Sequence, residues 1–396
     1  MTLTFEQARA TVLRETLQRR TLPAVETIPA LTADGRILAE DVAADRDYPP
    51  FPRSARDGFA VRAAELPGTF DVIGEVRAGS VFEGSVGAGQ TVEIMTGAPV
   101  PDGADAIVMV EHVTRDGDRM TTDRTHKSGD NFNPRGIEAR QGDVVLQRGT
   151  RLSFTEIAFL ATVGRDQVDV YKKPRVAILP TGDEIVNVNE TPSPHQIRNS
   201  NAWSMAIQTA RAGGEAVILP IARDNYESTR SLVEQGLDCD LLLLSGGVSA
   251  GKYDIVERVL ADCGAEFFFT RVLIQPGQPL VFGHARGRLF FGLPGNPAST
   301  MVTLEIFARA AIELASGANE ARLPLLETHL TRDFRQRPGL TRFLPARVSP
   351  DGATVEPLSW QGSGDVAALS QSNAFLVTEP DRETWSAGDR IRVLLK

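Results

Sequence analysis

Between residues 174 and 315 the sequence alternates short, almost continuously apolar runs with segments of helical periodicity. Strand-like runs of this kind separated by helices are typical of a parallel β-sheet covered by helices on both faces. The sequence therefore predicts a doubly wound α/β domain. Its predicted strands include residues 176–179, 216–219 and 241–244, and its predicted helices lie near 201–212, 226–236 and 254–262, with a last amphipathic helix after Pro297.

Gly-rich turns follow three of the strand-like runs, and two of these turns contain or lead to acidic residues. They occupy residues 180–184, residues 245–251 leading to Asp254, and residues 292–297. Because parallel strands end at one edge of a doubly wound sheet, we expect these turns to meet in a single crevice. Backbone amides in such turns hold phosphate groups, and carboxylates hold a hard cation.

Each of these turns has a competing structural interpretation. The stretch 246–253 nearly matches a phosphate-binding loop, but Tyr253 stands where a Ser or Thr would ligate magnesium, which disfavours an ordinary nucleoside triphosphatase. Taken alone, this stretch and the turn before Pro297 also suit plain strand-to-helix connections. Asp183 and Glu184 follow the first strand, and buried carboxylates at this place would need a partner such as a cation. Glu184 is the better functional candidate, since Asp183 also suits a turn cap.

The segments outside this region indicate further domains, as a chain of 396 residues requires. A helix is expected over residues 4–20, with Thr4 and Gln7 as a capping box. Short strands separated by turn signals predict a small β module from about 60 to 115 and a C-terminal β domain after Pro324. Loops at Asp57 and Thr96 in the β module are candidates for function.

Composition excludes several classes of function. The formal net charge of −9 argues against nonspecific binding to nucleic acid or to anionic membranes. No apolar run approaches the roughly 20 residues needed to span a bilayer, and the first residues lack the features of a secretory signal, so we expect a cytoplasmic protein. Cys239 and Cys263 show no metal or redox spacing and are expected to be small buried hydrophobes.

The motifs taken together resemble the molybdopterin molybdenumtransferase family, which is related to the E domain of gephyrin. The matching segments occur in family order along most of the chain. They are residues 49–51, Ser54, residues 57–61, 94–101, 103–105, 181–184, 200–201, 245–249 and 292–297.

The resemblance implies a transferase that accepts adenylylated molybdopterin, takes up molybdate and cleaves the adenylyl phosphate with Mg²⁺, so that AMP leaves and molybdenum stays on the dithiolene. It also implies a homodimer in which the β module of one subunit covers the α/β crevice of the other, and a molybdopterin adenylyltransferase as upstream partner. The implied domains are an elongated linker and dimerisation domain (1–45 and 139–171), an inserted β module (46–138), a molybdopterin-binding α/β domain (172–318) and a C-terminal barrel-like β domain (319–396).

Site residues follow from the resemblance by position. Asp57, Glu184 and Asp254 are the expected magnesium ligands and catalytic carboxylates, and Asp224 is a fourth catalytic candidate. The expected substrate-binding residues are Thr96, Glu138, Ser245, Gly246, Gly247, Ser249, Arg271, Gln275, Pro294, Gly295, Asn296 and Pro297.

Two departures from the family pattern affect the expected oxyanion chemistry. Gln275 and Gln278 stand where family members carry lysines, so these positions supply hydrogen bonds without charge, and Arg271 is the nearby candidate cation. Where an acidic pair is expected after Gly136, only Glu138 is acidic. A tungstate-preferring paralogue and a simple lineage variant both fit these changes, and the variant is the preferred interpretation.

Two rival functions fit the sequence less well. A noncatalytic scaffold of the gephyrin type would not need the clustered carboxylates Asp57, Glu184 and Asp254. A general nucleotide-binding hydrolase of the same α/β class would not need the loops at Asp57 and Thr96 in addition.

Overall fold

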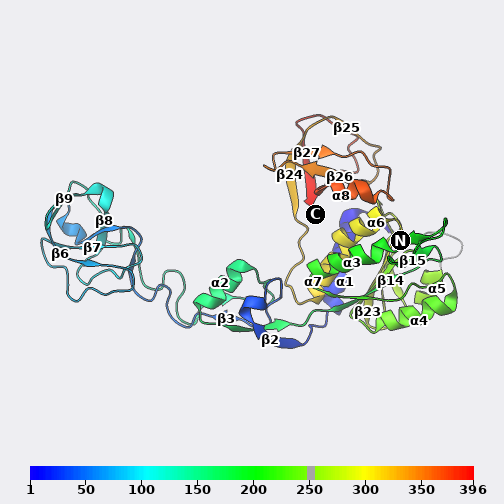
Figure 1. Cartoon of the computed structure of the whole chain (residues 1–396), viewed down its shortest axis with the longest axis horizontal. Coiled ribbons are helices and arrows are strands. Elements are labelled where there is room, and N and C mark those ends of the chain that lie inside the picture. Colours follow the sequence, from blue (N-terminus) through cyan, green and yellow to red (C-terminus); the bar gives the residue numbers. More distant parts are fainter. Residues whose placement is uncertain (248–254) are drawn as a thin grey trace.

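The computed structural model extends over residues 1–396, and the structure describes residues 1–247 and 255–396. The chain forms an elongated molecule (Figure 1). A small β module lies at one end, a narrow linker follows, and the α/β domain and the C-terminal β domain form the larger lobe at the other end. Among the described residues, no helix is long and apolar enough to cross a membrane.

The α/β domain is built on a six-stranded sheet in the order β17-β14-β18-β23-β22-β19. The first four strands are parallel, as predicted. Strand β22 pairs antiparallel with β23, and the edge strand β19 pairs antiparallel with β22. A tight turn at Arg286 and Gly287, both with positive φ, joins β22 to β23. The strands are β14 (Arg175–Pro180), β17 (Glu215–Ile218), β18 (Leu241–Ser245), β19 (Glu266–Phe269), β22 (Val281–Ala285) and β23 (Arg288–Leu293).

Helices cover both faces of this sheet, which confirms the doubly wound architecture. The apolar residues of α4 and α5 pack on one face, and those of α1, α3, α6 and α7 pack on the other. Two short strand pairs flank the domain, β1 (Thr2–Leu3) with β20 (Arg271–Val272) and β15 (Ile185–Val186) with β16 (Ile197–Arg198). The helices are α1 (Phe5–Arg19), α3 (Ser200–Arg211), α4 (Tyr226–Leu237), α5 (Ile255–Asp262), α6 (Pro297–Thr303), the π-helical segment η4 (Leu304–Ala308) and α7 (Arg309–Ala315).

The N-terminal helix α1 belongs to this core, although the expected boundaries assign it to the linker. Its predicted capping box is present, because Thr4 and Gln7 exchange hydrogen bonds at 3.1 and 3.2 Å. Phe5, Ala8 and Val12 are buried against the α/β domain. The chain therefore starts in the α/β domain, leaves it after Arg19, and returns to it at β14.

The linker has a small core of its own between these two crossings. It contains β2 (Val25–Pro29), η1 (Ala30–Thr32), β3 (Val42–Ala43), β12 (Val144–Leu146), α2 (Phe154–Thr162) and β13 (Gln167–Tyr171). Strand β13 pairs antiparallel with β2, so the outgoing and returning segments lie side by side.

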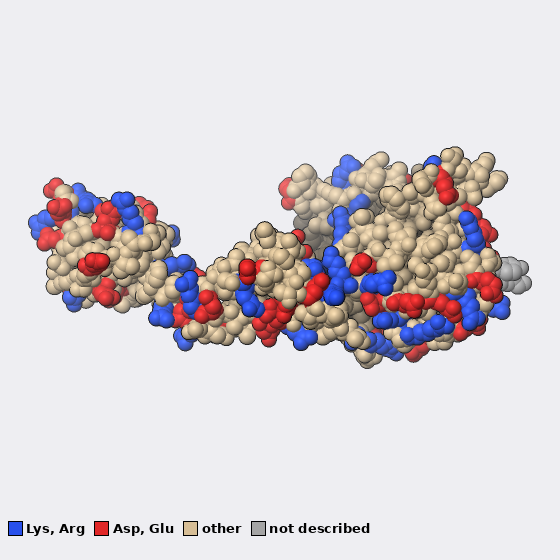
Figure 2. Space-filling model, turned by 60° about the horizontal axis from the view of Figure 1, so that its bottom comes forward, with Lys and Arg blue, Asp and Glu red and all other residues tan. Residues whose placement is uncertain are grey.

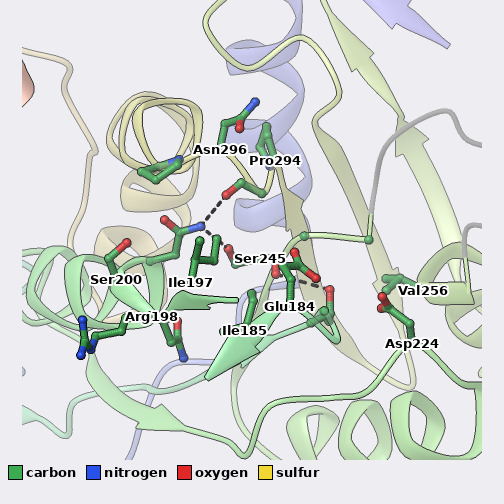
Figure 3. Close-up of a pocket in the computed structure, with 18 of the residues that line it drawn as sticks. Glu184, Ile185, Ile197, Arg198, Ser200, Asp224, Ser245, Val256, Pro294 and Asn296 are labelled. Carbon is green, nitrogen blue, oxygen red and sulfur yellow. Dashed lines mark hydrogen bonds between the residues drawn. The ribbon is translucent and has the colours of Figure 1, made fainter. Parts of the chain in front are cut away.

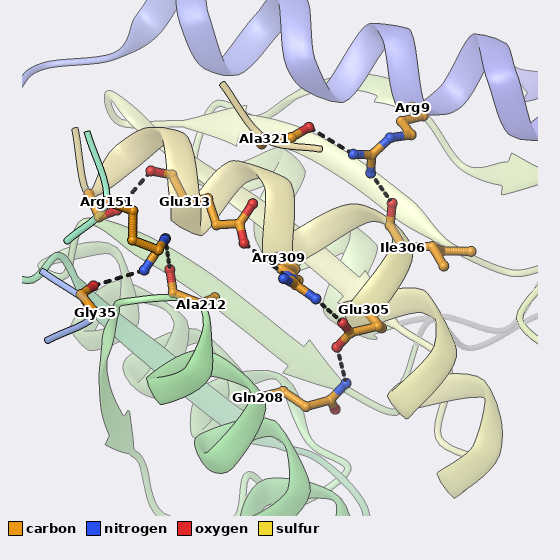
Figure 4. A network of polar contacts seen from close by, with 11 residues as sticks. Arg9, Gly35, Arg151, Gln208, Ala212, Glu305, Ile306, Arg309, Glu313 and Ala321 are labelled. Carbon is orange, nitrogen blue, oxygen red and sulfur yellow. Dashed lines mark hydrogen bonds and ion pairs between the residues drawn. The ribbon is translucent and has the colours of Figure 1, made fainter. Parts of the chain in front are cut away.

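A network of polar contacts ties the linker to the α/β domain (Figure 4). Arg151 of the linker donates to the carbonyl of Gly35 at 2.9 Å and to the carbonyl of Ala212, at the end of α3, at 3.2 Å. Close by, Arg309 of α7 pairs with Glu313 at 2.9 Å and with Glu305. Burial lowers the pKa of the Arg151 guanidinium. The joint between the two domains is thus a specific contact.

The β module carries a six-stranded sheet in the order β8-β5-β7-β6-β10-β9. Gly58 in β5 lies so close to β8 that an added Cβ would stand 2.0 Å from the carbonyl oxygen of Val108. The elements are β4 (Arg53–Ser54), β5 (Gly58–Val61), η2 (Ala63–Glu65), β6 (Gly68–Val76), β7 (Gln90–Ile94), β8 (Ala106–Met109), η3 (Val110–His112), β9 (Thr114–Asp116), β10 (Arg119–Thr122) and β11 (Phe132–Asn133).

The C-terminal domain is a closed β-barrel, as the family resemblance implies. Strands β26, β27, β24, β30 and β28 follow one another, and β28 pairs back with β26. The elements are β21 (Ile274–Gln275), β24 (Leu325–Leu330), β25 (Phe334–Arg335), β26 (Thr341–Val348), β27 (Thr354–Pro357), α8 (Val366–Gln371), β28 (Ala374–Thr378), β29 (Thr384–Trp385) and β30 (Arg390–Leu395). Strand β21 comes from the α/β segment and pairs with β26, which joins the barrel to the α/β domain.

Candidate functional site

A cavity of about 740 Å³ lies where the parallel strands β14, β18 and β23 end (Figure 3). The three predicted turns meet here, and the sequence-predicted residues that line the cavity are Glu184, Asp224, Ser245, Gly246, Gly247, Pro294, Gly295, Asn296 and Pro297. Ser249 and Asp254 lie outside the described residues. The structure thus brings most of the α/β candidates into one crevice.

Backbone forms much of the wall of this cavity. Gly246 has φ +95°, and a Cβ there would stand 2.9 Å from the carbonyl oxygen of Thr181. Gly247 has φ +66°, and a Cβ there would stand 2.7 Å from the side chain of Val256. Glycine is required at both positions because of the positive φ and the close packing. The Gly246 amide donates to the carbonyl of Leu293 at 3.2 Å, and the backbone of the turn lines the cavity without side chains.

Asn201 ties two of the turns together. Its amide nitrogen donates to the Ser245 hydroxyl at 2.9 Å and to the Gly295 carbonyl at 2.8 Å. Its amide oxygen is buried and has no hydrogen-bond partner. A buried unsatisfied acceptor is costly, so this oxygen is suited to accept a hydrogen bond from a ligand. The sequence shows Asn201 within a matching segment, but it was not among the predicted site residues.

The carboxylates of Glu184 and Asp224 stand on the opposite side of the cavity from Asn296 (Figure 3). Asp183 lies outside the lining, and its backbone amide donates to the Asp224 carboxylate at 3.4 Å while the Asp224 amide donates to Asp183 at 3.2 Å. The expectation that Asp183 and Glu184 are buried is wrong, because β14 ends at Pro180 and the turn places both side chains in solvent. Because both carboxylates are exposed, neither needs a cation or a hydrogen-bond donor to offset a cost of burial.

The described residues do not complete a metal site on their own. Within residues 1–247 and 255–396, no three His, Cys, Asp or Glu side chains are placed to hold one ion. The cavity contributes two carboxylates from the described residues, Glu184 and Asp224.

A smaller cavity of about 360 Å³ adjoins the first and shares Pro279, Pro294 and Asn296 with it. Gln275 and Gln278 line this second cavity, and each accepts a hydrogen bond from an arginine. Arg271 donates to Gln278 at 2.9 Å, and Arg342 donates to Gln275 at 2.7 Å. The side-chain oxygen of each glutamine is thus hydrogen-bonded to a guanidinium group.

Sequence reasoning missed Arg342. It lies 67 residues from Gln275 in the chain, on strand β26 of the barrel. Only the parallel pairing of β21 with β26 places the two residues opposite each other. No local pattern signals such a long-range pairing.

Three other predicted residues lie away from both cavities. Asp57 and Thr96 belong to the β module, at the far end of the molecule from the α/β domain (Figure 1). Thr96 donates to the Asp57 carboxylate from its backbone amide at 2.6 Å and from its hydroxyl at 2.8 Å, and these two hydrogen bonds lower the pKa of Asp57. Glu138 pairs with Arg53 at 2.5 Å. A single chain does not bring these residues to Glu184.

Three family models match the chain in succession. One described as the MoeA N-terminal region (domain I and II) matches residues 3–164, one described as a probable molybdopterin binding domain matches 177–314, and one described as the MoeA C-terminal region (domain IV) matches 327–396. The molybdopterin molybdenumtransferase of Bacillus subtilis (strain 168) is 36% identical over 374 residues, which cover 91% of this chain and 87% of that protein.

The chain belongs to the molybdopterin molybdenumtransferase family. The molybdopterin molybdenumtransferase of Staphylococcus aureus (strain Mu50 / ATCC 700699) agrees, being 33% identical over 388 residues, which cover 96% of this chain and 92% of that protein. Membership confirms the resemblance inferred from the motifs and the expectation of an enzyme of the transferase class.

Solved structures confirm the architecture of the molybdopterin molybdenumtransferase fold. The molybdopterin biosynthesis MoeA protein of Pyrococcus horikoshii OT3 superposes with a TM-score of 0.80 at 26% identity and covers 100% of both chains. A second structure of a MoeA protein from Pyrococcus has a TM-score of 0.71 at 30% identity and covers 100% of this chain and 99% of that chain.

Proposed function

We propose that this chain inserts molybdenum into adenylylated molybdopterin, taking the metal from molybdate and releasing AMP in a Mg²⁺-dependent step. The observation that carries the proposal is the pair of adjoining cavities. The larger cavity is lined by Gly-rich turns and by the carboxylates of Glu184 and Asp224. The smaller cavity is lined by Gln275 and Gln278, each of which accepts a hydrogen bond from an arginine. The larger cavity, about 740 Å³, is within the range of pockets that enclose a ligand of nucleotide size.

The larger cavity offers contacts for the phosphate groups of the organic substrate and for its pterin. The turn at Gly246 and Gly247 lines the cavity without side chains, so a phosphate of the adenylyl linkage can approach the backbone closely there. The unpartnered amide oxygen of Asn201 suits an N–H group, such as those on the edge of a pterin. Asn201 would then orient the substrate while the turn holds its phosphates.

Mg²⁺ fits the donor chemistry of Glu184 and Asp224. This ion prefers oxygen ligands and is commonly held by one or two carboxylates together with substrate phosphates and water, so a third protein ligand is not required. When bound, it would neutralise charge on the phosphate oxygens while the pyrophosphate bond to AMP is cleaved.

The molybdate site we propose is the smaller cavity. Gln275 and Gln278 each use the side-chain oxygen to accept from an arginine, which leaves their amide N–H groups to donate to an oxyanion. Arg271 and Arg342 supply the positive charge that lysines would otherwise provide. Because the two arginines replace the missing charge, we favour a lineage variant of the enzyme. The alternative is a preference for tungstate, which assays with molybdate and tungstate in parallel decide.

We also propose that the working enzyme is a homodimer in which Asp57 and Thr96 of one copy complete the cavity of the other. The support is the placement of Asp57 and Thr96 on an exposed loop of the β module, far from the cavity of their own chain. A second copy is the simplest source of a β module at that cavity.

The test is release of AMP from adenylylated molybdopterin by the purified full chain with Mg²⁺, using molybdate and tungstate in parallel. We expect release with molybdate, and a loss in kcat/KM of about 100-fold in Glu184→Gln, as is common when an electrostatic contact to the transition state is removed. Glu320→Gln, an exposed carboxylate outside both cavities, is the matched control. No AMP release with either oxyanion would reject the enzyme and favour the scaffold.

A further inference from the structure

A separate cavity of about 440 Å³ lies at the opposite edge of the α/β sheet. Its lining includes Arg175, Leu241 and Arg288, which are the first residues of the parallel strands β14, β18 and β23. The candidate site lies at the other ends of the same strands. The two cavities therefore share no lining residue.

This cavity lies at the joint between the linker and the α/β domain. The chain leaves the α/β domain through residues 20–24 and returns through residues 172–174, and both segments line the cavity. The backbone amide of Lys172 donates to the carbonyl of Ala24 at 2.8 Å, so the two connecting segments are in contact. A ligand in this cavity would touch both connections and the edge of the sheet at once.

The cavity is strongly basic. Among the described residues that line it, Asp240 is the one acidic side chain. Figure 2 shows Lys and Arg gathered where the narrow linker meets the larger lobe. The six basic residues in the lining are Arg19, Arg20, Lys172, Lys173, Arg175 and Arg288. In a chain with a net charge of −9, so local an excess of positive charge is unexpected without an anion to balance it.

Much of this charge is not compensated within the described part of the chain. Arg288 pairs with Asp240 at 3.2 Å, and Arg19 pairs with Glu15 and, at 3.4 Å, with Glu266. Arg20 instead donates to the carbonyl of Ala318 at 2.9 Å. Among the described residues, Lys172 and Lys173 have no carboxylate within ion-pair distance, and both side chains are exposed. Like charges held together repel, so an anion bound among them would be stabilised.

A residue in the lining of this cavity also carries a buried hydroxyl without a partner. Thr16 of α1 is 2% exposed and lines the cavity, and its Oγ1 makes no hydrogen bond in the structure. A buried polar group without a partner costs free energy, and a hydroxyl is a good donor to a phosphate oxygen. The unpartnered hydroxyl of Thr16 is therefore a second indication of a ligand site, independent of the basic residues.

We propose that this cavity binds a compact anion with two or more linked phosphate groups, of the pyrophosphate class, and that the bound anion fixes the linker relative to the α/β domain. Among the described residues, the side chains of Arg20, Lys172, Lys173 and Arg175 have no carboxylate partner, and their four positive charges exceed the charge of about −2 on a single phosphate. A cavity of about 440 Å³ suits a small molecule. Because the linker carries the β module, its angle sets where Asp57 is presented. Binding of this anion is independent of the proposed molybdenum transfer.

The first test is calorimetric titration of the full chain with inorganic pyrophosphate at about 0.15 M salt, where exposed charges are screened. We expect saturable binding, a loss of at least tenfold in affinity in Lys172→Gln/Lys173→Gln, and a loss of several fold in the near-isosteric Thr16→Val. Arg119→Gln/Arg124→Gln removes the same charge from exposed positions of the β module and should bind like the wild type. Equal affinity in all four proteins, or equally tight binding of orthophosphate, would overturn the proposal.

The second test locates the bound anion by hydrogen exchange. Pyrophosphate should slow exchange of the backbone amides in residues 20–24 and 172–175 of the wild type, and this effect should be absent in Lys172→Gln/Lys173→Gln. Slowed exchange confined to residues 181–184 and 245–247 would place pyrophosphate in the candidate site instead and would refute the proposal.

Discussion

Asp57 accepts both of its side-chain hydrogen bonds from Thr96, one from the backbone amide and one from the hydroxyl. These contacts hold the pKa of the Asp57 carboxyl below the ordinary value, with the backbone amide as the larger cause. The stabilisation is therefore present above the unfolded pKa of about 3.9 and is lost as the pH falls through the lowered folded pKa. At neutral pH the side chain is a fixed anion, ready to interact with a cation.

Replacing Thr96 by Val should raise the pKa of Asp57, because the hydroxyl donor is lost. The backbone amide donor remains, so the pKa should stay below that of an unperturbed Asp. A carboxyl-carbon NMR titration of both proteins measures the change, with Asp365, whose lowered pKa depends on other donors, as an internal control. An unchanged pKa for Asp57 in Thr96→Val would show that the hydroxyl contact is not formed in solution.

Arg342 should control the use of molybdate. Since a hydrogen bond from a charged group contributes roughly 1.5–3 kcal/mol, Arg342→Gln should raise KM for molybdate about tenfold or more. Adding Gln275→Lys to this variant returns a positive charge at the same place and should restore much of the affinity. An unaltered KM in Arg342→Gln would contradict the proposed oxyanion site.

At the scale of elements, the parallel strands and their helices could be predicted from the sequence because apolar runs and helical periodicity are local signals. The positions of α3, α4 and α5 agree with the prediction to within about two residues. The antiparallel strands β19 and β22 and the placement of α1 in the α/β core depend on long-range packing. The same is true of Arg342, which only the pairing of β21 with β26 brings to Gln275.

Gly58 tests the packing of the β module. A methyl group at this position would overlap the carbonyl of Val108, so Gly58→Ala must push β5 away from β8. We expect a loss in the free energy of unfolding of about 3 kcal/mol, as for other overpacked sites. Chemical denaturation measures this loss against Gly364→Ala, where an added Cβ meets no atom within 4 Å. Equal stability of the two variants would show that β5 and β8 are not this closely packed.

At the scale of the whole molecule, the sequence predicts two groups of functional residues but not the distance between them. The turns after β14, β18 and β23 converge because parallel strands end at one edge of a sheet. Asp57 and Thr96 lie in a module that the linker holds far from that edge. In the proposed homodimer, another copy brings its β module to the cavity and completes the site.

Subunit complementation tests this claim most directly. Asp57→Asn and Glu184→Gln homodimers should each be nearly inactive in AMP release. A mixed dimer with one variant subunit of each kind, isolated with two affinity tags, contains one cavity with Asp57 from one subunit and Glu184 from the other, both unaltered. We expect this mixed species to have about half of the wild-type activity per dimer. Activity no higher than that of the parent variants would contradict a site shared between two copies.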